Sequence, residues 1–100
     1  MTAWHRVGAA AEFADGAVRE IRIGERILAV GRADGALFCL DDWCPHAGAS
    51  LAQGTLDDGV LVCPLHGFAY DVRTGQCEDD PTPAATFPVR ERDGEVEVEL

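Results

Sequence analysis

Short apolar stretches alternate with turn-forming pairs along most of the chain. Three stretches, residues 18–23, 26–30 and 36–40, are rich in Val, Ile, Leu and Phe and are shorter than typical helices, so each predicts a β-strand. The C-terminal segment 95–100 alternates strictly between Glu and an apolar residue, which is typical of a strand with one buried face. We expect it to pair with residues 87–92.

Glycine-containing pairs separate these stretches. Glycine and aspartate tolerate the positive φ angles of tight hairpins, so each pair predicts a turn between antiparallel strands. The pairs are Asp15-Gly16, Gly24-Glu25, Asp34-Gly35, Asp58-Gly59 and Asp93-Gly94. Together, stretches and turns predict an all-β fold, a small antiparallel β sandwich or barrel.

Two segments depart from this pattern. Residues 7–13 have a helix-forming composition, but over about one turn only. Residues 43–83 contain more Cys, His, Gly and Pro and less alternation than the rest of the chain. We therefore expect a single domain over residues 1–100, with an inserted lobe at about 43–83 that carries the chemistry.

The composition is that of a folded, acidic protein. Apolar residues make up 47% and charged residues 26% of the 100 residues, enough for one modest core. The net charge of -10 disfavours nucleic acid and anionic membranes as partners, and favours a basic patch on another protein. The chain has no signal-peptide-like start and no apolar run long enough to span a membrane, so we expect a cytoplasmic protein.

Two short motifs each combine one cysteine with one histidine. Cys-Pro-His contains Cys44 and His46, and Cys-Pro-Leu-His, sixteen residues after His46, contains Cys63 and His66. In a reducing cytosol such pairs indicate metal ligands rather than disulfides. One zinc ion could use these four ligands, although common zinc modules place like ligands together in one motif. Mixed motifs suit two metal ions side by side, one bound by the two thiolates and one by the two imidazoles.

The full pattern Cys-x-His-x16-Cys-x2-His, with Pro after each Cys and Gly after the second His, resembles the Rieske family. Residues 68–75 are similar to the strand and turn that follow the second motif in small Rieske ferredoxins. Pro81-Thr82-Pro83 resembles the proline-containing loop that covers the cluster in this family. The resemblance implies the Rieske fold and one Rieske-type 2Fe-2S cluster.

The resemblance also implies a role for each ligand. Cys44 and Cys63 would bind the inner iron, and His46 and His66 the outer iron near the surface. Two ferric ions, two sulfides, two thiolates and two neutral imidazoles sum to about zero charge, whereas four thiolates would leave about two negative charges. A neutral cluster accepts an electron more easily than one with four thiolate ligands. Its reduction needs no nucleophile.

Similarity to the ferredoxin components of aromatic-ring dioxygenase systems implies an electron carrier, not an enzyme. It would act as a monomer that docks transiently, taking electrons from a flavin-dependent NAD(P)H reductase and passing them to a Rieske-type terminal oxygenase. An accessory small subunit of a nitrite-reductase-like complex and a zinc-stabilised binding module remain alternatives. A terminal oxygenase is excluded, because its mononuclear iron needs two further histidines and only His5 remains.

Other residues have simpler interpretations. We expect Cys39 to be buried and inert, assign Cys77 no role, and favour packing over docking for Trp43. Tyr70 is expected to be a half-buried strand residue, or else a hydrogen-bond donor to Cys44. Four acidic residues are candidates for salt-sensitive steering of a partner: Asp41, Asp42, Asp79 and Asp80.

Three positions bear on the reduction potential. Rieske proteins of respiratory and photosynthetic complexes carry an extra cysteine in each motif, where this chain has Ala49 and Leu65. They also carry a serine where this chain has Phe68. Without these stabilisers of the reduced cluster, we expect a potential near the low end of the Rieske range, roughly -150 mV.

Overall fold

The computed structural model describes residues 2–43, 50–64, 67–78 and 81–100. Within these residues the chain forms short strands and two 3-10 turns, and every pair of neighbouring strands is antiparallel. The expected all-β class is therefore confirmed. The elements are β1 (Trp4–Ala9), η1 (Ala10–Glu12), β2 (Val18–Ile23), β3 (Arg26–Ala33), β4 (Ala36–Asp41), η2 (Leu51–Gln53), β5 (Thr55–Asp57), β6 (Val60–Val62), β7 (Ala69–Asp71), β8 (Val89–Arg92) and β9 (Glu95–Glu99).

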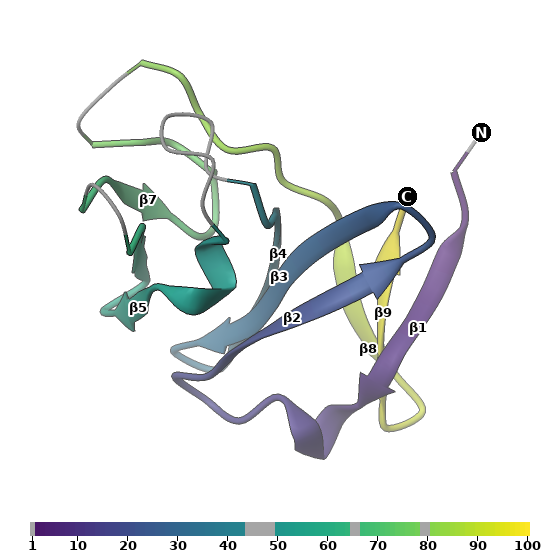
Figure 1. Cartoon of the computed structure of the whole chain (residues 1–100). Coiled ribbons are helices and arrows are strands. Elements are labelled where there is room, and N and C mark those ends of the chain that lie inside the picture. The colour runs from purple at the N-terminus through teal and green to yellow at the C-terminus, as the bar shows by residue number, and fades with distance from the viewer. Residues whose placement is uncertain (1, 44–49, 65–66, 79–80) are drawn as a thin grey trace.

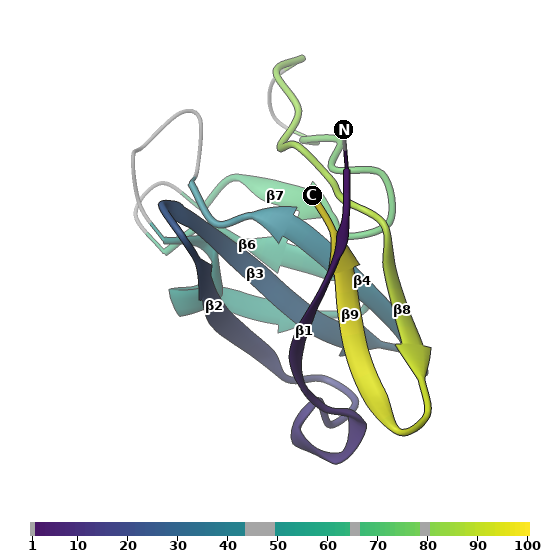
Figure 2. The same ribbon diagram turned by 90° about the vertical axis from the view of Figure 1, so that its right-hand side faces the viewer.

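The described strands form three sheets, in the orders β1-β9-β8, β2-β3-β4 and β5-β6-β7. Figures 1 and 2 show the β2-β3-β4 sheet between the other two, with β5 and β7 on one side and β1, β8 and β9 on the other. The segment before β8 returns beside β4, where the Asp41 N–H donates to the Ala85 carbonyl (2.9 Å) and the Phe87 N–H to the Cys39 carbonyl (3.0 Å). The β2-β3-β4 sheet is thus the central layer of the molecule.

Buried residues form one core on each face of this central sheet. The barrel core, toward β1 and β9, consists of Phe13, Leu28, Val30, Cys39, Val96 and Val98. The lobe core, toward β6 and β7, consists of Ala29, Phe38, Leu40, Leu51, Leu61, Cys63, Tyr70, Val72 and Ala84. Because successive residues of a strand point to opposite faces, β3 and β4 must be apolar at every central position. This explains why their sequences are apolar runs rather than alternating patterns.

Most of the expected turns are confirmed. Asp34, Asp58 and Asp93 have φ angles of 51–52°, and the glycine after each is also at positive φ. Positive φ at both central residues is the geometry that joins two strands by a two-residue hairpin. The pair at Asp15 also forms a turn, with Gly16 at a φ of 84°, but this turn connects η1 to β2 and is not a hairpin between antiparallel strands. Asp15 instead forms a parallel bridge with Arg32 on β3.

Residues 7–13 contain one helical turn, as expected, but it covers residues 10–12 only. Residues 7–9 belong to β1, which pairs with β9, and only the single turn η1 follows. Pairing with the alternating C-terminal strand outweighs the weak helix propensity of the alanines. The Glu12 carboxylate accepts a hydrogen bond from the Ala9 N–H (2.8 Å) and so closes the turn. Among the described residues, no helix has the length and apolar character needed to cross a membrane.

Candidate metal centre

Cys63 is the predicted ligand that the structure describes. It directly follows β6, is 1% exposed and belongs to the lobe core. The other three predicted ligands, Cys44, His46 and His66, lie outside the described residues. In the described part of the chain no group of three metal-binding side chains occurs. The ligand set therefore stays a prediction, and the structure bears on it through the segments that bracket each motif.

Backbone hydrogen bonds close the second motif at its base. The Cys63 N–H donates to the Phe68 carbonyl (2.8 Å), and the Gly67 N–H donates back to the Cys63 carbonyl (3.1 Å). Gly67 has a φ of 71°, which favours glycine, and the ladder continues with Val62 opposite Ala69. The short connection between β6 and β7 is thus fixed on both sides of residues 64–66.

A side chain closes the first motif. The Asp42 carboxylate accepts hydrogen bonds from the Ser50 hydroxyl (2.6 Å) and the Ala52 N–H (2.7 Å), and the Leu51 N–H donates to the Asp42 carbonyl (2.7 Å). Trp43 and Ser50 form an isolated antiparallel bridge between these contacts. Asp42 and the start of η2 therefore hold together the two ends of segment 43–50.

Asp42 differs from the steering residue expected from the sequence. It is 4% exposed and is the buried charged residue of the described chain. Burial raises the pKa of its carboxyl group, and the hydrogen bonds from Ser50 and Ala52 oppose that shift. A carboxylate withdrawn from solvent contributes little to long-range attraction, so the role predicted for Asp42 was wrong. Asp79 and Asp80 lie outside the described residues.

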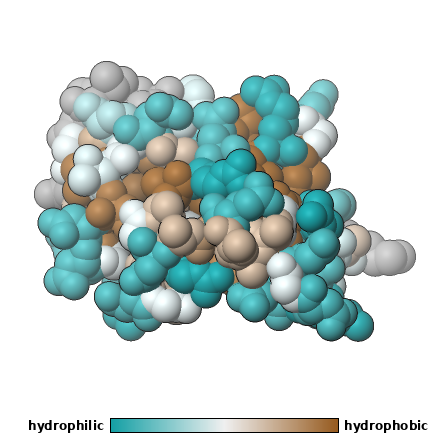
Figure 3. Space-filling model, turned by 90° about the horizontal axis from the view of Figure 1, so that it is seen from below, coloured by the Kyte–Doolittle hydropathy of each residue, from teal (hydrophilic) through white to brown (hydrophobic). Residues whose placement is uncertain are grey.

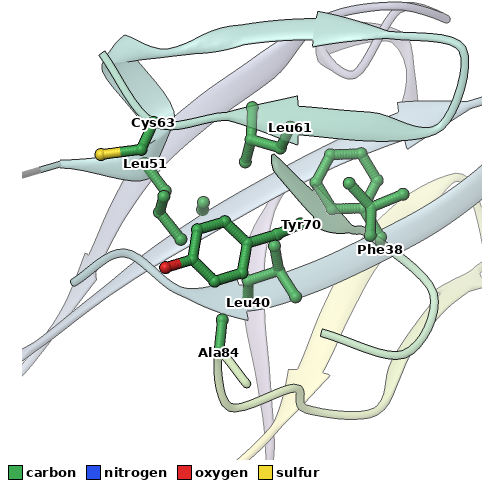
Figure 4. Close-up of a cluster of buried hydrophobic side chains, with 9 residues drawn as sticks. Phe38, Leu40, Leu51, Leu61, Cys63, Tyr70 and Ala84 are labelled. Atoms are coloured by element: carbon green, nitrogen blue, oxygen red, sulfur yellow. The ribbon is translucent and has the colours of Figure 1, made fainter. Parts of the chain in front are cut away.

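The lobe core contains described residues from the segments of both motifs. Leu51, which follows the Asp42 contacts, and Cys63 are both fully buried in it (Figure 4). Gly54 allows η2 and the end of β6 to approach closely, since a Cβ atom at this position would lie 2.0 Å from the Val62 carbonyl oxygen. Tyr70 is also fully buried, not half-buried as expected, and its hydroxyl points to the same end of the core as the Cys63 sulfur in Figure 4.

A third segment reaches this end of the molecule after β7. The Gly75 N–H donates to the Asp71 carbonyl (2.7 Å), and the Ala84 N–H donates to the Gly75 carbonyl (2.8 Å). These bonds join both ends of segment 75–84, which contains Pro81-Thr82-Pro83. Pro83 lines a surface hollow together with Trp43, the residue before the first motif. The proline segment and the residue that precedes the first motif thus meet at one surface.

Trp43 is exposed, so the packing role expected for it was wrong. The residue is 64% exposed, and among the described residues it is the large hydrophobic residue that is exposed. Its backbone is nevertheless fixed, because the Trp43 N–H donates to the Asp41 carboxylate (3.0 Å). It also borders a second hollow of about 750 Å³ with Glu20 and Glu25.

The other two cysteines match their expected characters. Cys39 is 2% exposed in the barrel core, and burial raises the pKa of its thiol to about 12. Cys77 is partly exposed, and its backbone forms an isolated antiparallel β-bridge with that of Tyr70. Neither is adjacent in sequence to a histidine, so neither offers the paired ligands of the two motifs.

The residues present fit a two-iron cluster in which two cysteine sulfurs bind one iron and two histidine nitrogens bind the other. Cys63, buried at the end of a strand, suits an inner ligand shielded from water. The chain matches the family model described as "Rieske [2Fe-2S] domain" over residues 3–92. It belongs to the Rieske family. Its cofactor is accordingly a Rieske-type 2Fe-2S cluster.

Relatives of this Rieske chain include ferredoxin subunits of dioxygenases. It is 37% identical over 99 residues to the anthranilate 1,2-dioxygenase ferredoxin subunit of Burkholderia cepacia, covering 97% of this chain and 92% of that one. It is 40% identical over 98 residues to ferredoxin CarAc of Metapseudomonas resinovorans, covering 95% and 92%. A chain of the solved structure "Complex of reduced oxygenase and oxidized ferredoxin in carbazole 1,9a-dioxygenase" superposes with a TM-score of 0.88 at 40% identity, covering 95% and 91%.

Proposed function

We propose that this chain is the ferredoxin component of a Rieske oxygenase system. It would carry single electrons from a flavin-dependent NAD(P)H reductase to a Rieske-type terminal oxygenase. The observation that carries the proposal is the similarity to ferredoxin subunits over more than nine-tenths of both chains. The carrier is not itself the catalyst. A cytoplasmic location suits it, because a reductase that uses reduced nicotinamide would supply its electrons there.

In this proposal the cluster is held by Cys44 and Cys63 at the inner iron and by His46 and His66 at the outer iron. When bound, the cluster takes up and releases one electron. The lobe core beneath Cys63 excludes water from the sulfur side. The two imidazoles would face the surface and bring the cluster edge close to a partner. The chain needs no substrate pocket or catalytic base for this task.

The spectrum of the purified protein tests the proposed ligands. Wild type is expected to be coloured, to contain about two irons per chain and to show the signal of a reduced Rieske cluster in electron paramagnetic resonance. His46→Cys and His66→Cys should abolish or change that signal, because a thiolate replaces a neutral imidazole. A colourless protein containing zinc would support the zinc-module alternative. A variant with an unaltered spectrum and potential would show that its histidine is not a ligand.

We also propose that this chain binds the oxygenase weakly and as a monomer. The contact would lie over the surface around His46, His66 and Trp43. A carrier must leave its partner after every transfer, which favours a small contact. Figure 3 shows a different face, where hydrophilic side chains surround apolar patches. We assign no docking role to that face, because exposed apolar atoms are ordinary on folded proteins.

Replacement of each tryptophan tests the docking proposal. Trp43→Ala should slow electron transfer to the cognate oxygenase by about tenfold without changing the spectrum, since exposed aromatic residues often dominate such contacts. Trp4→Ala is the matched control, because Trp4 lies on β1 against the Arg90 guanidinium (3.9 Å from ring centroid to carbon). Equal transfer rates for wild type and Trp43→Ala would remove this residue from the docking surface.

A further inference from the structure

Asp42 is hydrogen-bonded at every polar group it possesses. Its N–H donates to the Ile27 carbonyl (3.0 Å), and its carbonyl accepts from the Leu51 N–H (2.7 Å). Its two carboxylate oxygens accept separately from Ala52 (2.7 Å) and Ser50 (2.6 Å). One residue therefore joins β3 of the central sheet to the beginning of η2.

This arrangement is costly if stability alone is considered. Moving a carboxylate out of water carries a large penalty, and a well-packed apolar residue often stabilises a buried position as much or more. The Ser50 hydroxyl is also 3.3 Å from the exposed carboxylate of Glu20. Its single proton goes to Asp42, the nearer acceptor at 2.6 Å. A second carboxylate beside the first raises the cost of keeping Asp42 in place.

The backbone pairing beside the two motifs differs, and this difference indicates the role of Asp42. The second motif is bracketed by β6 and β7, whose ladder continues through Cys63 and Phe68. Among the described residues that flank the first motif there is no such ladder, because β4 ends at Asp41 and the isolated bridge between Trp43 and Ser50 is the strand pairing that follows. The Asp42 carboxylate supplies there the two bonds that a further pair of strand residues would otherwise make.

We propose that Asp42 is a positioning residue for the metal centre. By binding Ser50 and Ala52 it sets the separation of the two ends of segment 43–50. It thereby holds Cys44 and His46 where the cluster needs them. The inference rests on the proposed ligand set, and it adds to that set a residue that does not touch the metal. Residues that orient metal ligands through hydrogen bonds typically change metal affinity by about 10-fold to 100-fold when replaced.

The test compares cluster loss in the loaded protein with a matched control. Bleaching of the visible spectrum by an iron chelator is followed for wild type, Asp42→Ala, Asp42→Asn and Asp15→Ala. Asp15 makes the same kind of contact far from the motifs, accepting a hydrogen bond from the Gly35 N–H (3.0 Å). We expect Asp42→Ala to lose its cluster at least about 10-fold faster than wild type. Asp15→Ala should match wild type even where its melting temperature is lower.

Asp42→Asn separates the hydrogen bonds from the charge. Its amide oxygen can accept from Ala52 while its amide nitrogen donates to the Ser50 hydroxyl, so it should restore most of the retention. If Asp42→Ala does not fold, Ser50→Ala carries the test, because it deletes one of the two side-chain bonds. We expect it to lose the cluster several-fold faster than wild type and Asp15→Ala.

Three results would overturn the proposal: cluster loss from Asp42→Ala or Ser50→Ala at the wild-type rate, equally fast loss from Asp15→Ala, or no rescue by Asp42→Asn. The resonance signal of the remaining cluster provides a further readout. A shifted signal in Asp42→Ala, restored in Asp42→Asn, supports positioning of the ligands, because general destabilisation lowers the amount of cluster without changing its signal. A wild-type protein without a Rieske spectrum would instead refute the proposed ligand set, and the positioning role with it.

Discussion

The two cores on either side of the central sheet are built differently. The central sheet borders both cores, and on its other side the barrel core is covered by β1, β8 and β9, which are strands of four to six residues. The lobe core lies against strands of three residues, and its surroundings are held by individual contacts such as those of Asp42 and Gly75. The barrel core thus depends on continuous strand pairing. The lobe core depends on particular bonds, which lie at the proposed metal centre.

Two buried cysteines illustrate the same difference. Cys39 and Cys63 are 2% and 1% exposed, so burial alone does not distinguish them. Cys39 lies within β4 and faces the barrel core. Cys63 lies at the end of β6, where the chain leaves the sheet. A cysteine at the end of a strand can present its sulfur to a group outside the sheet while its backbone remains anchored.

A matched pair of leucines should separate the two cores most strongly. Leu28 and Leu51 are both fully buried, one in each core. Replacement of either by Ala should lower the free energy of unfolding by about 2–5 kcal/mol, because it leaves a cavity. Only Leu51→Ala should also accelerate loss of the cluster to a chelator at a temperature where both variants are folded. Urea unfolding and visible absorption measure the two effects, and equal rates of cluster loss would contradict the division.

Gly75 tests whether the lobe depends on single contacts. A Cβ atom at Gly75 would lie 2.1 Å from the Ala84 carbonyl oxygen, and the residue has a φ of 78°. Gly59 has nearly the same φ, 77°, but nothing within 4 Å of that position. Gly59→Ala should therefore cost about 1 kcal/mol of backbone strain, and Gly75→Ala about 2–3 kcal/mol through strain and displacement of segment 75–84. Equal melting temperatures for the two variants would show that segment 75–84 can move to accommodate the methyl group without loss of stability.

The sequence predicted the barrel well because its information there is local. Alternation in residues 95–100 and the Asp-Gly pairs give strands and turns directly, although strand ends shift, as in β3, which continues to Ala33 while pairing with β4. The four ligands are inferred from their motifs alone and stay a prediction. The roles of Asp42 and Trp43 could not be predicted, because a carboxylate is buried and an indole exposed only through contacts between distant segments. No periodicity in residues 43–83 encodes those contacts.

Tyr70 should influence the potential more than the stability. If its buried hydroxyl donates to the Cys44 thiolate, it favours the reduced cluster by a fraction of a charged hydrogen bond worth about 1.5–3 kcal/mol. Tyr70→Phe should then lower the potential by a few tens of millivolts, since about 59 mV corresponds to 1.4 kcal/mol for one electron. Protein-film voltammetry measures both proteins. A wild-type potential above about +100 mV would contradict the low-potential expectation, and an unshifted variant would rule out the bond.

The smallest effect should be a difference in the rate of alkylation between Cys39 of the barrel core and Cys77 beside the lobe core. A thiol reacts with alkylating reagents as its thiolate. Burial raises the pKa of Cys39 to about 12, so almost none of this thiol is ionised at pH 8, and the reagent cannot reach it. Iodoacetamide should therefore modify the loaded protein at Cys77, which is partly exposed, and leave Cys39 unmodified until urea unfolds the chain. Mass spectrometry of digested peptides measures each site, with Cys77→Ser as the control that should remain unlabelled. Rapid labelling of Cys39 in the folded protein would show that the barrel core opens more readily than its continuous strands imply.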